Sequence, residues 1–512
     1  MRNNIGSFLG KRAFLNPHNE AVCEPDTGRR FTFRELDQRA NRVANALAAS
    51  GVGTGDRVGI LLMNGVEFVE TFFGIAKLGA VVVPLNWRLV PDELEFILKD
   101  SGTKALVFGG EFAVPVAELH GRGDRTDVST WTQLGGEVAP FAVAYDDWTG
   151  AASAAEPPVT AVGDDNLFLM YTSGTTGLPK GVVHTHDTVM WGIFTINATA
   201  DVHHGDRYLI SLPLFHVGAL SPALGNVYKG ACMVIPKTFD PRQSLALFGT
   251  EKITTGLMVP AMLQFCLAVY DAATHDLSSV RWIMSGAAPV AVSLIKAFEA
   301  LHVEIHQVYG LTESCGPACL VSPDDALTRA GSTGKAFFHT DVRIVREDDT
   351  DCDPGEPGEV IVRGPHIMKE YWNRPEATAQ TIRDGWLHTG DVATMDADGF
   401  VTIMDRIKDM LISGGENVYP AEIESVLLAN PRVADAAIVG IPSAKWGESP
   451  LAIVVPKDPT LTAAEVMDWC KGKLAPFKLV KAVELVTEIP RNPSGKILKR
   501  VLREQFSYDA AE

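Results

Sequence analysis

The sequence lacks long apolar runs and an excess of positive charge. Its apolar runs, such as Val58–Met63 and Ala80–Leu85, are much shorter than the roughly 20 residues that a membrane-spanning helix needs. No basic region followed by an apolar run and a small-residue cleavage site opens the chain, so we expect no signal peptide. The formal net charge of −18 argues against general affinity for nucleic acids.

Cysteine is also scarce, and its pattern excludes a disulfide framework. The chain has 7 cysteines scattered over 512 residues, and only Cys315 and Cys319 lie close together. No second pair and no suitably spaced histidines accompany them, so we interpret them as small residues near a functional turn and not as metal ligands. The sequence therefore predicts a protein of the reducing cytoplasm.

The remaining composition is that of a globular protein with more than one domain. Hydrophobic residues make up 46% and charged residues 21% of the chain, and 512 residues exceed one ordinary domain. Basic residues form only local groups near the two ends, and no amphipathic basic helix is present, so we expect at most peripheral membrane contact.

The first region alternates between expected helices and strands. Thr32 and Glu35 form a capping-box pattern, and the apolar residues that follow recur at helical spacing. The segments "DRVGILLMN", "VEFVETFFGIAKLGA" and "VVVPLN" then predict strand, helix and strand. This alternation favours a parallel sheet with helices on its faces.

The pattern changes near residues 405–409. The segments "YPAEIESVLLANP", "VADAAIVGIP", "LAIVVPKD", "LTAAEVMDWCKGKLA" and "VKAVELVTEIP" predict helix, strand, strand, helix and strand. We therefore expect a small α+β domain of about a hundred residues at the end of the chain.

One loop, "YTSGTTGLPKG" from Tyr171 to Gly181, has the composition of a phosphate-binding turn. Backbone N–H groups of glycine-rich turns, together with hydroxyls and a lysine, hold phosphate oxygens. The Walker pattern is not met, because Pro179 stands where its second glycine should be and Gly181 follows Lys180 in place of Ser or Thr.

Four further segments have residue types suited to nucleotide chemistry. In "QVYGLTESCG", Tyr309 could stack on a base, and Glu313 is an oxygen ligand suited to Mg²⁺ or simply a charge at a helix start. Asp391 in "WLHTGD" could accept both hydroxyls of a ribose or cap a turn. Arg406 lies beside a Gly-Gly loop, and Lys496 follows Pro-Ser-Gly on an expected exposed turn.

The segments "YTSGTTGLPKG", "YGLTES", "TGD", "DRIKD…SGGENVYP.EIE" and "NPSGK", in this order, resemble the adenylate-forming acyl-CoA synthetase family. The resemblance runs from "FTFREL" to Lys496, and the chain looks most like the compact fatty-acyl-CoA ligases of mycobacteria. It implies an α/β fold, with a large N-terminal domain of mixed sheets sandwiched by helices plus a small β subdomain. A small mobile C-terminal α+β domain follows. The expected boundaries are 1–404, a hinge at 405–408, and 409–512.

The resemblance implies a ligase that uses ATP, Mg²⁺ and coenzyme A. A carboxylate first attacks the α-phosphate of ATP, giving an acyl-adenylate and pyrophosphate. The thiol of coenzyme A then attacks the acyl carbon and releases AMP. Positioned cations and donors would stabilise the charge that develops on the α-phosphate.

Family roles carry over to matching positions of this chain. The resemblance implies that Lys496 is the catalytic lysine, that Thr312 contacts phosphate, and that Glu313 holds Mg²⁺, with Thr176 as a weaker ligand. Tyr309 matches the adenine-stacking position, and Asp391 and Arg406 match the ribose-binding positions. The remaining ATP-site positions are Thr172, Ser173, Gly174, Thr175, Thr176, Gly177, Lys180, Gly286, Ala287, Ala288 and Gly310.

The expected hinge residue is Lys408, where many family members have aspartate. After the first step the C-terminal domain is expected to swing, so that Lys496 leaves and the "SGGEN" loop faces the thioester channel. The residues expected in that second step are Ser413, Gly414, Gly415 and Glu416. Glycines there would let the loop approach pantetheine closely, because they lack a Cβ.

The expected acyl pocket lies around "SLPLFHVGALSPALG", "TTGLMVPAM" and "MSGAAPV". His216 stands where amino-acid adenylation domains usually have aspartate, so it disfavours an amino acid; it is either a packed histidine or a gate for the carboxylate. These stretches hold no Lys or Arg to pair with a second carboxylate. An apolar monocarboxylic acid is favoured, first a medium-to-long-chain fatty acid and second an aryl acid of the cinnamate or benzoate kind. The expected lining is His216, Gly218, Val259, Gly286 and Ala287.

Two other functions compete with the acyl-CoA ligase. One is an adenylating enzyme that loads a carrier protein, although the chain has no carrier-type domain. The other is a non-catalytic nucleotide-binding relative, which retention of the residues above disfavours. "PRNPSGK" also resembles the context in which this family's lysine is reversibly acylated, so a protein lysine acyltransferase or deacylase is a possible partner at Lys496. We expect a monomer or a homodimer.

Overall fold

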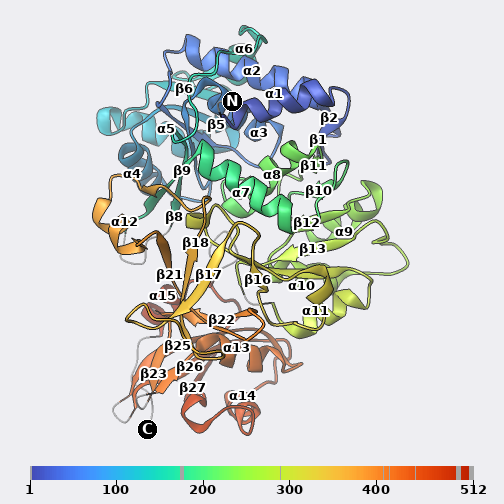
Figure 1. The fold of residues 1–512 in the computed structure, drawn as a ribbon, viewed down its shortest axis with the longest axis vertical. Coiled ribbons are helices and arrows are strands. Elements are labelled where there is room, and N and C mark those ends of the chain that lie inside the picture. Colours follow the sequence, from blue (N-terminus) through green and yellow to red (C-terminus); the bar gives the residue numbers. More distant parts are fainter. Residues whose placement is uncertain are drawn as a thin grey trace.

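Four β-sheets form the frame of the chain that the structure describes (Figure 1). The structure is a computed structural model, and it describes residues 3–172, 178–288, 290–407, 409–413, 416–443, 446–491 and 497–506. Two large sheets and one small sheet come from the first four-fifths of the chain, and the fourth sheet from its end.

The eight-stranded sheet is parallel in its middle and antiparallel at one edge. The predicted strands around "VGILL" and "VVVP" are both in it, side by side and parallel. Its order is β19 (Glu370–Tyr371), β9 (Lys180–Thr185), β8 (Asn166–Thr172), β4 (Val81–Pro84), β3 (Arg57–Leu61), β5 (Thr103–Gly109), β6 (Thr130–Leu134) and β7 (Val143–Ala144).

The nine-stranded sheet is likewise parallel in its middle, with antiparallel strands at both edges. Ligands of such sheets bind beyond the carboxyl ends of the parallel strands. Its order is β16 (Lys335–Ala336), β15 (Cys319–Leu320), β14 (Glu304–Tyr309), β13 (Trp282–Ser285), β12 (Thr255–Leu257), β10 (Arg207–Leu209), β11 (Cys232–Val234), β1 (Glu20–Glu24) and β2 (Arg29–Thr32).

Helices cover the two sheets and separate them. Those of the first part of the chain are α1 (Gly6–Leu15), α2 (Phe33–Ala49), α3 (Val66–Leu78), α4 (Pro91–Ser101), α5 (Ala113–Gly121), α6 (Tyr145–Gly150), α7 (His186–Thr199), α8 (Val217–Lys229), α9 (Pro241–Thr250), α10 (Pro260–Val269), α11 (Val292–Glu299) and α12 (Pro375–Thr381). Short 3-10 helices are η1 (Gly110–Phe112), η2 (Gly123–Arg125), η3 (Thr312–Ser314), η4 (Pro323–Asp325) and η5 (Pro476–Lys478).

The predicted capping box at the start of α2 is confirmed. The Thr32 hydroxyl accepts from the Glu35 backbone N–H at 3.3 Å, and the Thr32 N–H donates to the Glu35 carboxylate at 2.8 Å. These two bonds satisfy donors that a helix start otherwise leaves unpaired. The apolar residues expected on one face of this helix are fully buried, namely Leu36, Ala40, Val43 and Leu47.

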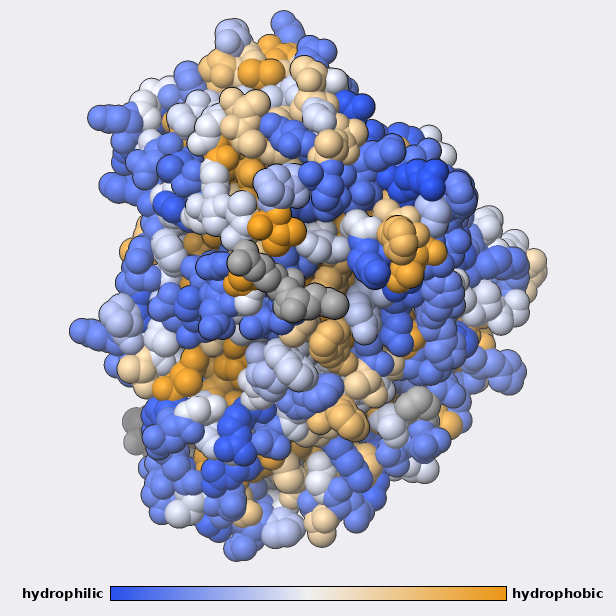
Figure 2. Space-filling model, turned by 45° about the horizontal axis from the view of Figure 1, so that its top comes forward, coloured by the Kyte–Doolittle hydropathy of each residue, from blue (hydrophilic) through white to orange (hydrophobic). Residues whose placement is uncertain are grey.

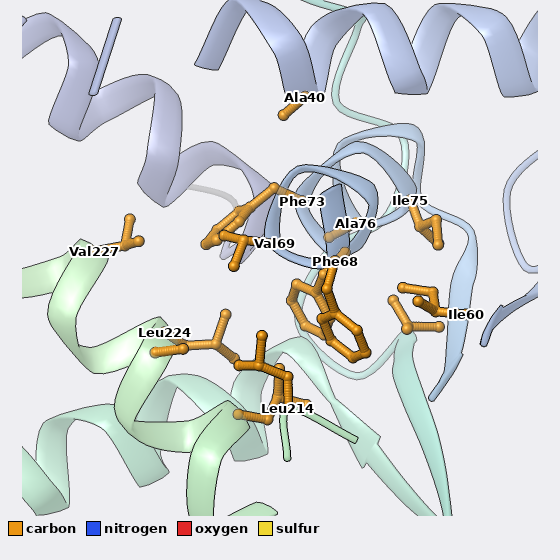
Figure 3. Packing of buried hydrophobic residues seen from close by; sticks show 14 of the residues in the cluster. Ala40, Ile60, Phe68, Val69, Phe73, Ile75, Ala76, Leu214, Leu224 and Val227 are labelled. Atoms are coloured by element: carbon orange, nitrogen blue, oxygen red, sulfur yellow. The ribbon is translucent and has the colours of Figure 1, made fainter. Parts of the chain in front are cut away.

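The main hydrophobic core lies between α2, α3 and α8, and α3 is at its centre. Figure 3 shows Val69 and Phe73 on α3 facing Leu224 and Val227 on α8, while Ala40 approaches α3 from α2. Each large apolar side chain of α3 that is fully buried stabilises the fold by about 1.5–3 kcal/mol. α3 therefore helps to hold the two large sheets together. α8, whose first residues are in the expected acyl pocket, is therefore fixed to a rigid core.

The small antiparallel sheet follows the nine-stranded sheet along the chain. Its strands are β17 (Asp341–Val345), β18 (Gly358–Arg363), β20 (Ile382–Arg383), β21 (Trp386–Met395) and β22 (Val401–Arg406). It corresponds to the expected small β subdomain. The segment "WLHTGD", in which a turn was one expectation for Asp391, is instead part of the long strand β21.

The end of the chain folds around the fourth sheet, at one end of the long axis in Figure 1. Its predicted order is confirmed as α13 (Pro420–Leu428), β25 (Val433–Ser443), β26 (Gly447–Pro456), α14 (Ala463–Cys470) and β27 (Ala482–Leu485). The sequence did not indicate β23 (Leu411–Ser413), β24 (Glu416–Val418) and α15 (Lys499–Gln505). The predicted fold class, α/β with a large N-terminal part and a small α+β part, is thus confirmed.

Polar side chains dominate the surface. Figure 2 shows hydrophilic residues over most of one face, with hydrophobic residues in separate patches. None of the helices that the structure describes is long and apolar enough to cross a membrane. All 7 cysteines lie within the described ranges and are free thiols, and Cys315 and Cys319 are fully buried.

Candidate active site

A cavity of about 1610 Å³ lies at the carboxyl ends of strands from both large sheets, and C-terminal residues line part of it. It brings together most of the expected site residues that the structure describes. These lining residues are Thr172, Lys180, His216, Gly218, Val259, Gly286, Ala287, Gly310, Thr312, Glu313, Asp391 and Arg406. Tyr309 and Ala288 do not line the cavity, but the Tyr309 hydroxyl is hydrogen-bonded to the lining residue Asp391.

The expected phosphate loop connects β8 to β9. Thr172 and Lys180 pair across this hairpin, and both line the cavity. The Lys180 ammonium lies 4.5 Å from the centre of the Tyr371 ring, a cation–π contact that helps to hold it at the wall. The other expected loop residues, Ser173, Gly174, Thr175, Thr176 and Gly177, lie outside the described residues.

Thr312 and Glu313 are held by contacts from two other parts of the chain. His184 Nε2 lies 2.7 Å from the Thr312 carbonyl oxygen, and burial lowers the pKa of His184 to about 4. The imidazole is therefore neutral at pH 7, and Nε2 carries the proton that it donates to this carbonyl. The Tyr371 hydroxyl donates to Glu313 Oε1 at 2.8 Å, which orients the carboxylate.

Gly310 lets this turn pass close to its own continuation. A Cβ on Gly310 would lie 1.4 Å from the carbonyl oxygen of Gly316, a distance no side chain permits. Glycine is therefore required for the "YGLTES" turn to fold back and expose Thr312 and Glu313 at the cavity.

Asp391 joins two neighbouring strands at the cavity wall. It pairs with Arg406 across β21 and β22, and its Oδ1 lies 3.1 Å from Arg406 Nε. Its Oδ2 accepts from the Tyr309 hydroxyl at 2.6 Å. An ionised carboxylate has about four acceptor positions, so this group can accept further hydrogen bonds from a ligand.

The expected acyl side of the cavity begins at His216, directly before α8. Burial and the nearby Arg88 lower the pKa of His216 to about 4, so its ring is neutral at pH 7. Its ring packs 4.5 Å from that of Phe215, and Phe215 packs against Trp87. Gly218 and Val259 continue the wall along α8 and before α10.

Arg88 is a lining residue that the sequence interpretation missed. The stretches considered for the acyl pocket hold no Lys or Arg, but Arg88 reaches the cavity from the segment after β4. Its guanidinium lies 3.9 Å from the Trp87 ring centre, and it has no carboxylate partner among the described residues. The absence of Lys and Arg from the three acyl-pocket stretches therefore does not mean that the acyl side of the cavity lacks a cation, because Arg88 approaches His216 from another segment.

The C-terminal part contributes Arg491 and Leu498 to the cavity lining. Lys496, between these two residues in sequence, lies outside the described residues, as do Lys408, Gly414 and Gly415. Ser413 ends β23, is buried, and does not line the cavity. Glu416 begins β24, its hairpin partner.

Tyr371 and His184 also escaped sequence reasoning. Neither is in one of the motif segments, and both act on the "YGLTES" turn from more than 50 residues away in sequence. Among the described residues, no group of three or more His, Cys, Asp or Glu is positioned to hold a metal ion.

Comparisons with known proteins identify the family of the chain. A model of the "AMP-binding enzyme" family matches residues 9–372, and a model of the "AMP-binding enzyme C-terminal domain" matches residues 422–496. The chain is 43% identical to a long-chain-fatty-acid–CoA ligase, FadD13, of Mycobacterium tuberculosis, covering 98% of this chain and 99% of the relative. It is 40% identical to a feruloyl-CoA synthase of an Amycolatopsis species, covering 99% and 100%.

A solved structure, that of the anthranilate CoA ligase AuaEII in complex with anthranoyl-AMP, has a TM-score of 0.91 and 30% identity to this chain. The match covers 99% of this chain and 98% of that structure. The resemblance noted in the sequence is thus confirmed over nearly the whole chain, which belongs to the AMP-binding enzyme family of adenylate-forming enzymes.

Proposed function

We propose that the chain is an AMP-forming acyl-CoA ligase that activates an apolar monocarboxylic acid. The observation that carries this proposal is one cavity lined both by the expected nucleotide residues and by the expected acyl wall. A reaction between a carboxylate and the α-phosphate of ATP needs these two regions to meet. Relatives named as CoA ligases of fatty, aryl and indoleacetic acids support the reaction class.

In the first step, a carboxylate oxygen attacks the α-phosphorus and pyrophosphate leaves. Lys180, Thr172 and the loop residues Ser173–Gly177 would hold the leaving pyrophosphate. Thr312 and Lys496 would stabilise the charge on the α-phosphate, and such a group is worth on the order of 10²–10³ in rate. Arg491 and Leu498, on either side of Lys496 in sequence, line the cavity, which supports this role.

Glu313 is the residue that would hold Mg²⁺. Of the two Glu313 carboxylate oxygens, Oε1 accepts from the Tyr371 hydroxyl, and Oε2 has no hydrogen-bond partner among the described residues. Mg²⁺ in nucleotide sites is held by one or two carboxylates, substrate phosphates and water, so a single carboxylate fits such a site. The ion, when bound, would neutralise phosphate charge. Thr176 would be a second, weaker protein ligand.

Asp391 and Arg406 would hold the ribose, and Tyr309 the adenine. The Tyr309 hydroxyl already donates to Asp391, which ties the two expected positions together. Gly286, Ala287, Ala288 and Gly310 would complete the wall around the nucleotide.

In the second step, the thiol of coenzyme A attacks the acyl carbon, the bond from this carbon to the phosphate oxygen breaks, and AMP leaves. We propose domains at 1–404 and 409–512 that rotate about 405–408, with Lys408 as the hinge. A rotation would alter contacts of the hinge itself, since Asp405, its first residue, accepts from the Ala421 N–H of the C-terminal part at 3.0 Å. Ser413, Gly414, Gly415 and Glu416 would then face the thioester channel.

The acid itself is proposed to be a medium-to-long-chain fatty acid, bound along His216, Gly218, Val259, Gly286 and Ala287. His216 is neutral and would border the carboxylate without repelling it or pairing with it. A second candidate is an aryl-acid CoA ligase, which the 40% identity to a feruloyl-CoA synthase favours. Loading of a carrier protein is a third, and a relative named as a fatty acid–acyl-carrier-protein ligase is 38% identical.

Further proposals concern regulation and assembly. Acylation of Lys496 by a protein lysine acyltransferase, reversed by a deacylase, would remove its charge and stop the first step. We propose a cytoplasmic monomer or homodimer.

The test measures carboxylate-dependent pyrophosphate release and thioester formation across a panel of fatty and aryl acids, with and without coenzyme A. We expect pyrophosphate release, AMP and a thioester with at least one class of acid. Pyrophosphate release without a thioester would point to a carrier-protein enzyme. No release with any acid would contradict the ligase proposal.

A further inference from the structure

The cavity lining includes two buried polar groups that have no hydrogen-bond partner among the described residues. Tyr208, on β10, and Asn226, on α8, both line it and are only 3% and 1% exposed. In the part of the chain that the structure describes, neither the Tyr208 hydroxyl nor Asn226 Nδ2 has a hydrogen-bond partner. Leaving such a group unpaired costs about 1–3 kcal/mol, so native proteins almost always satisfy it.

The position of Asn226 relates this polar group to the rest of the cavity. Asn226 follows His216 by 10 residues along α8, which corresponds to about 15 Å of helix rise. Gly218, Ser221, Pro222 and Gly225 line the cavity between them at helical spacing. The cavity lining along α8 thus runs from His216, at the expected carboxylate entrance, to Asn226, the last α8 residue that lines the cavity.

Asn197 on α7 adds a third polar group at the same end. Its Nδ2 donates to the Ile193 carbonyl oxygen at 2.8 Å, while its Oδ1 is buried and has no partner among the described residues. A Cβ on Gly225 would lie 3.5 Å from Asn197 Nδ2, so this amide lies beside α8 at the residue that precedes Asn226. The cavity end therefore offers an acceptor, a donor and a hydroxyl that can do both.

Apolar side chains accompany these groups. Tyr208 belongs to the main hydrophobic core, and Ile196, which precedes Asn197 on α7, packs with Val202 and Phe337, which also line the cavity. A plain alkyl or phenyl end of a substrate would displace water there and leave the polar groups unpaired. A site with buried polar groups discriminates strongly against a substrate that lacks the matching group.

We propose that the acid substrate carries a hydroxyl group at the end remote from its carboxylate, and that Tyr208, Asn226 and Asn197 bind this hydroxyl. The substrate class is therefore an elongated ω-hydroxy fatty acid. The hydroxyl donates to Asn197 Oδ1 and accepts from Asn226 Nδ2 or from the Tyr208 hydroxyl. This inference rests on the proposed function and names its substrate class.

The test compares kcat/KM for pyrophosphate release between matched acids that differ only in the terminal hydroxyl, over a series of chain lengths. Two or three neutral hydrogen bonds of about 1 kcal/mol each predict a preference on the order of 10- to 100-fold for the hydroxy acid of the best length. Shorter acids, which do not reach the polar end, should show no preference.

Two variants test whether Tyr208 and Asn226 cause the preference for the hydroxy acid. Tyr208→Phe removes only the hydroxyl, and Asn226→Leu replaces the amide with an apolar group of similar shape. Both should reduce the preference for the hydroxy acid, and Asn226→Leu should leave kcat/KM for the plain acid equal or higher. Ile196→Leu is the matched control, which should change both acids equally. Thermal unfolding of each variant verifies that it folds.

Equal kcat/KM for the two acids at every chain length would overturn the inference, because bound water would then satisfy the polar groups. So would a preference that both Tyr208→Phe and Asn226→Leu leave unchanged. Pyrophosphate release from both acids at equal rates would leave the proposed function standing. No release from any acid would remove the proposed function, and this inference with it.

Discussion

Replacing Asp391 with asparagine would keep the side-chain shape and remove a negative charge from a buried position. Asp391 is 6% exposed, its Oδ1 lies 3.1 Å from Arg406 Nε, and its Oδ2 accepts from the Tyr309 hydroxyl. If the carboxylate also accepts both ribose hydroxyls of ATP, the variant exchanges charged acceptors for one neutral amide oxygen.

The magnitude follows from the hydrogen bonds lost. A hydrogen bond to a charged group contributes about 1.5–3 kcal/mol, and one between neutral groups about 0.5–1.5 kcal/mol. Weakening two bonds therefore costs roughly 2–4 kcal/mol, which is on the order of 30- to 1,000-fold in kcat/KM for ATP. The loss should be much smaller for 2′-deoxyATP, because this nucleotide lacks one of the two hydroxyls.

The assay is the initial rate of pyrophosphate release at saturating acid, with ATP or 2′-deoxyATP varied. Wild-type protein should prefer ATP, and Asp391→Asn should lose most of this preference. Asp396→Asn is a matched control, because Asp396 lies just beyond the same strand and pairs with Arg329 at 3.2 Å, away from the cavity lining. A preference for ATP that survives intact in Asp391→Asn would refute the ribose assignment.

Three other predictions follow from the site. Lys496→Ala should reduce acyl-adenylate formation by on the order of 10²–10³ yet leave thioester formation from supplied acyl-adenylate largely intact; an equal loss in both half-reactions would contradict its role. Gly310→Ala should lower stability and abolish pyrophosphate release, because its Cβ would meet the Gly316 carbonyl oxygen, and thermal unfolding with the activity assay checks this. His184 has a folded pKa of about 4, below its unfolded value near 6.5, so its contribution to stability is present above pH 6.5 and is lost as the pH falls from 6.5 to 4. This loss amounts to about 3 kcal/mol in the unfolding free energy, and denaturant titrations should show a shallower pH dependence in His184→Gln, which can keep the bond to Thr312.

Local patterns predicted much of the fold. The capping box of Thr32 and Glu35 and the apolar spacing after it depend on neighbours within two helical turns, so the sequence specifies them directly. The same holds for the order of helices and strands at the end of the chain. The strand that contains Asp391 was not distinguished from a turn, because the Thr-Gly pair before Asp391 is typical of a turn and the pairing with Arg406 on the next strand is not visible in this short segment.

The motif residues of the site were predictable, and the residues that position them were not. Thr312 and Glu313 are in a compact motif, but the contacts from His184 and Tyr371 arise only when separate strands meet. Arg88 reaches the cavity from a segment with no motif.

The polarity of the acyl pocket was likewise only partly predictable from the sequence. Small residues along α8 were visible as a pattern, whereas the polar end at Tyr208 and Asn226 depends on packing between β10, α7 and α8. Substrate preference is therefore the property that the sequence indicated least.

The central claim is that an acyl-adenylate forms in the cavity and is then attacked by a thiol. The most direct test traces the carboxylate oxygens. An acid labelled with ¹⁸O in both carboxylate positions is turned over, and the ¹⁸O content of the AMP is measured by mass spectrometry. The account predicts one ¹⁸O atom in each AMP, because the oxygen that attacks the α-phosphorus stays with the phosphate when the acyl carbon is transferred. Unlabelled AMP formed together with the thioester would contradict it.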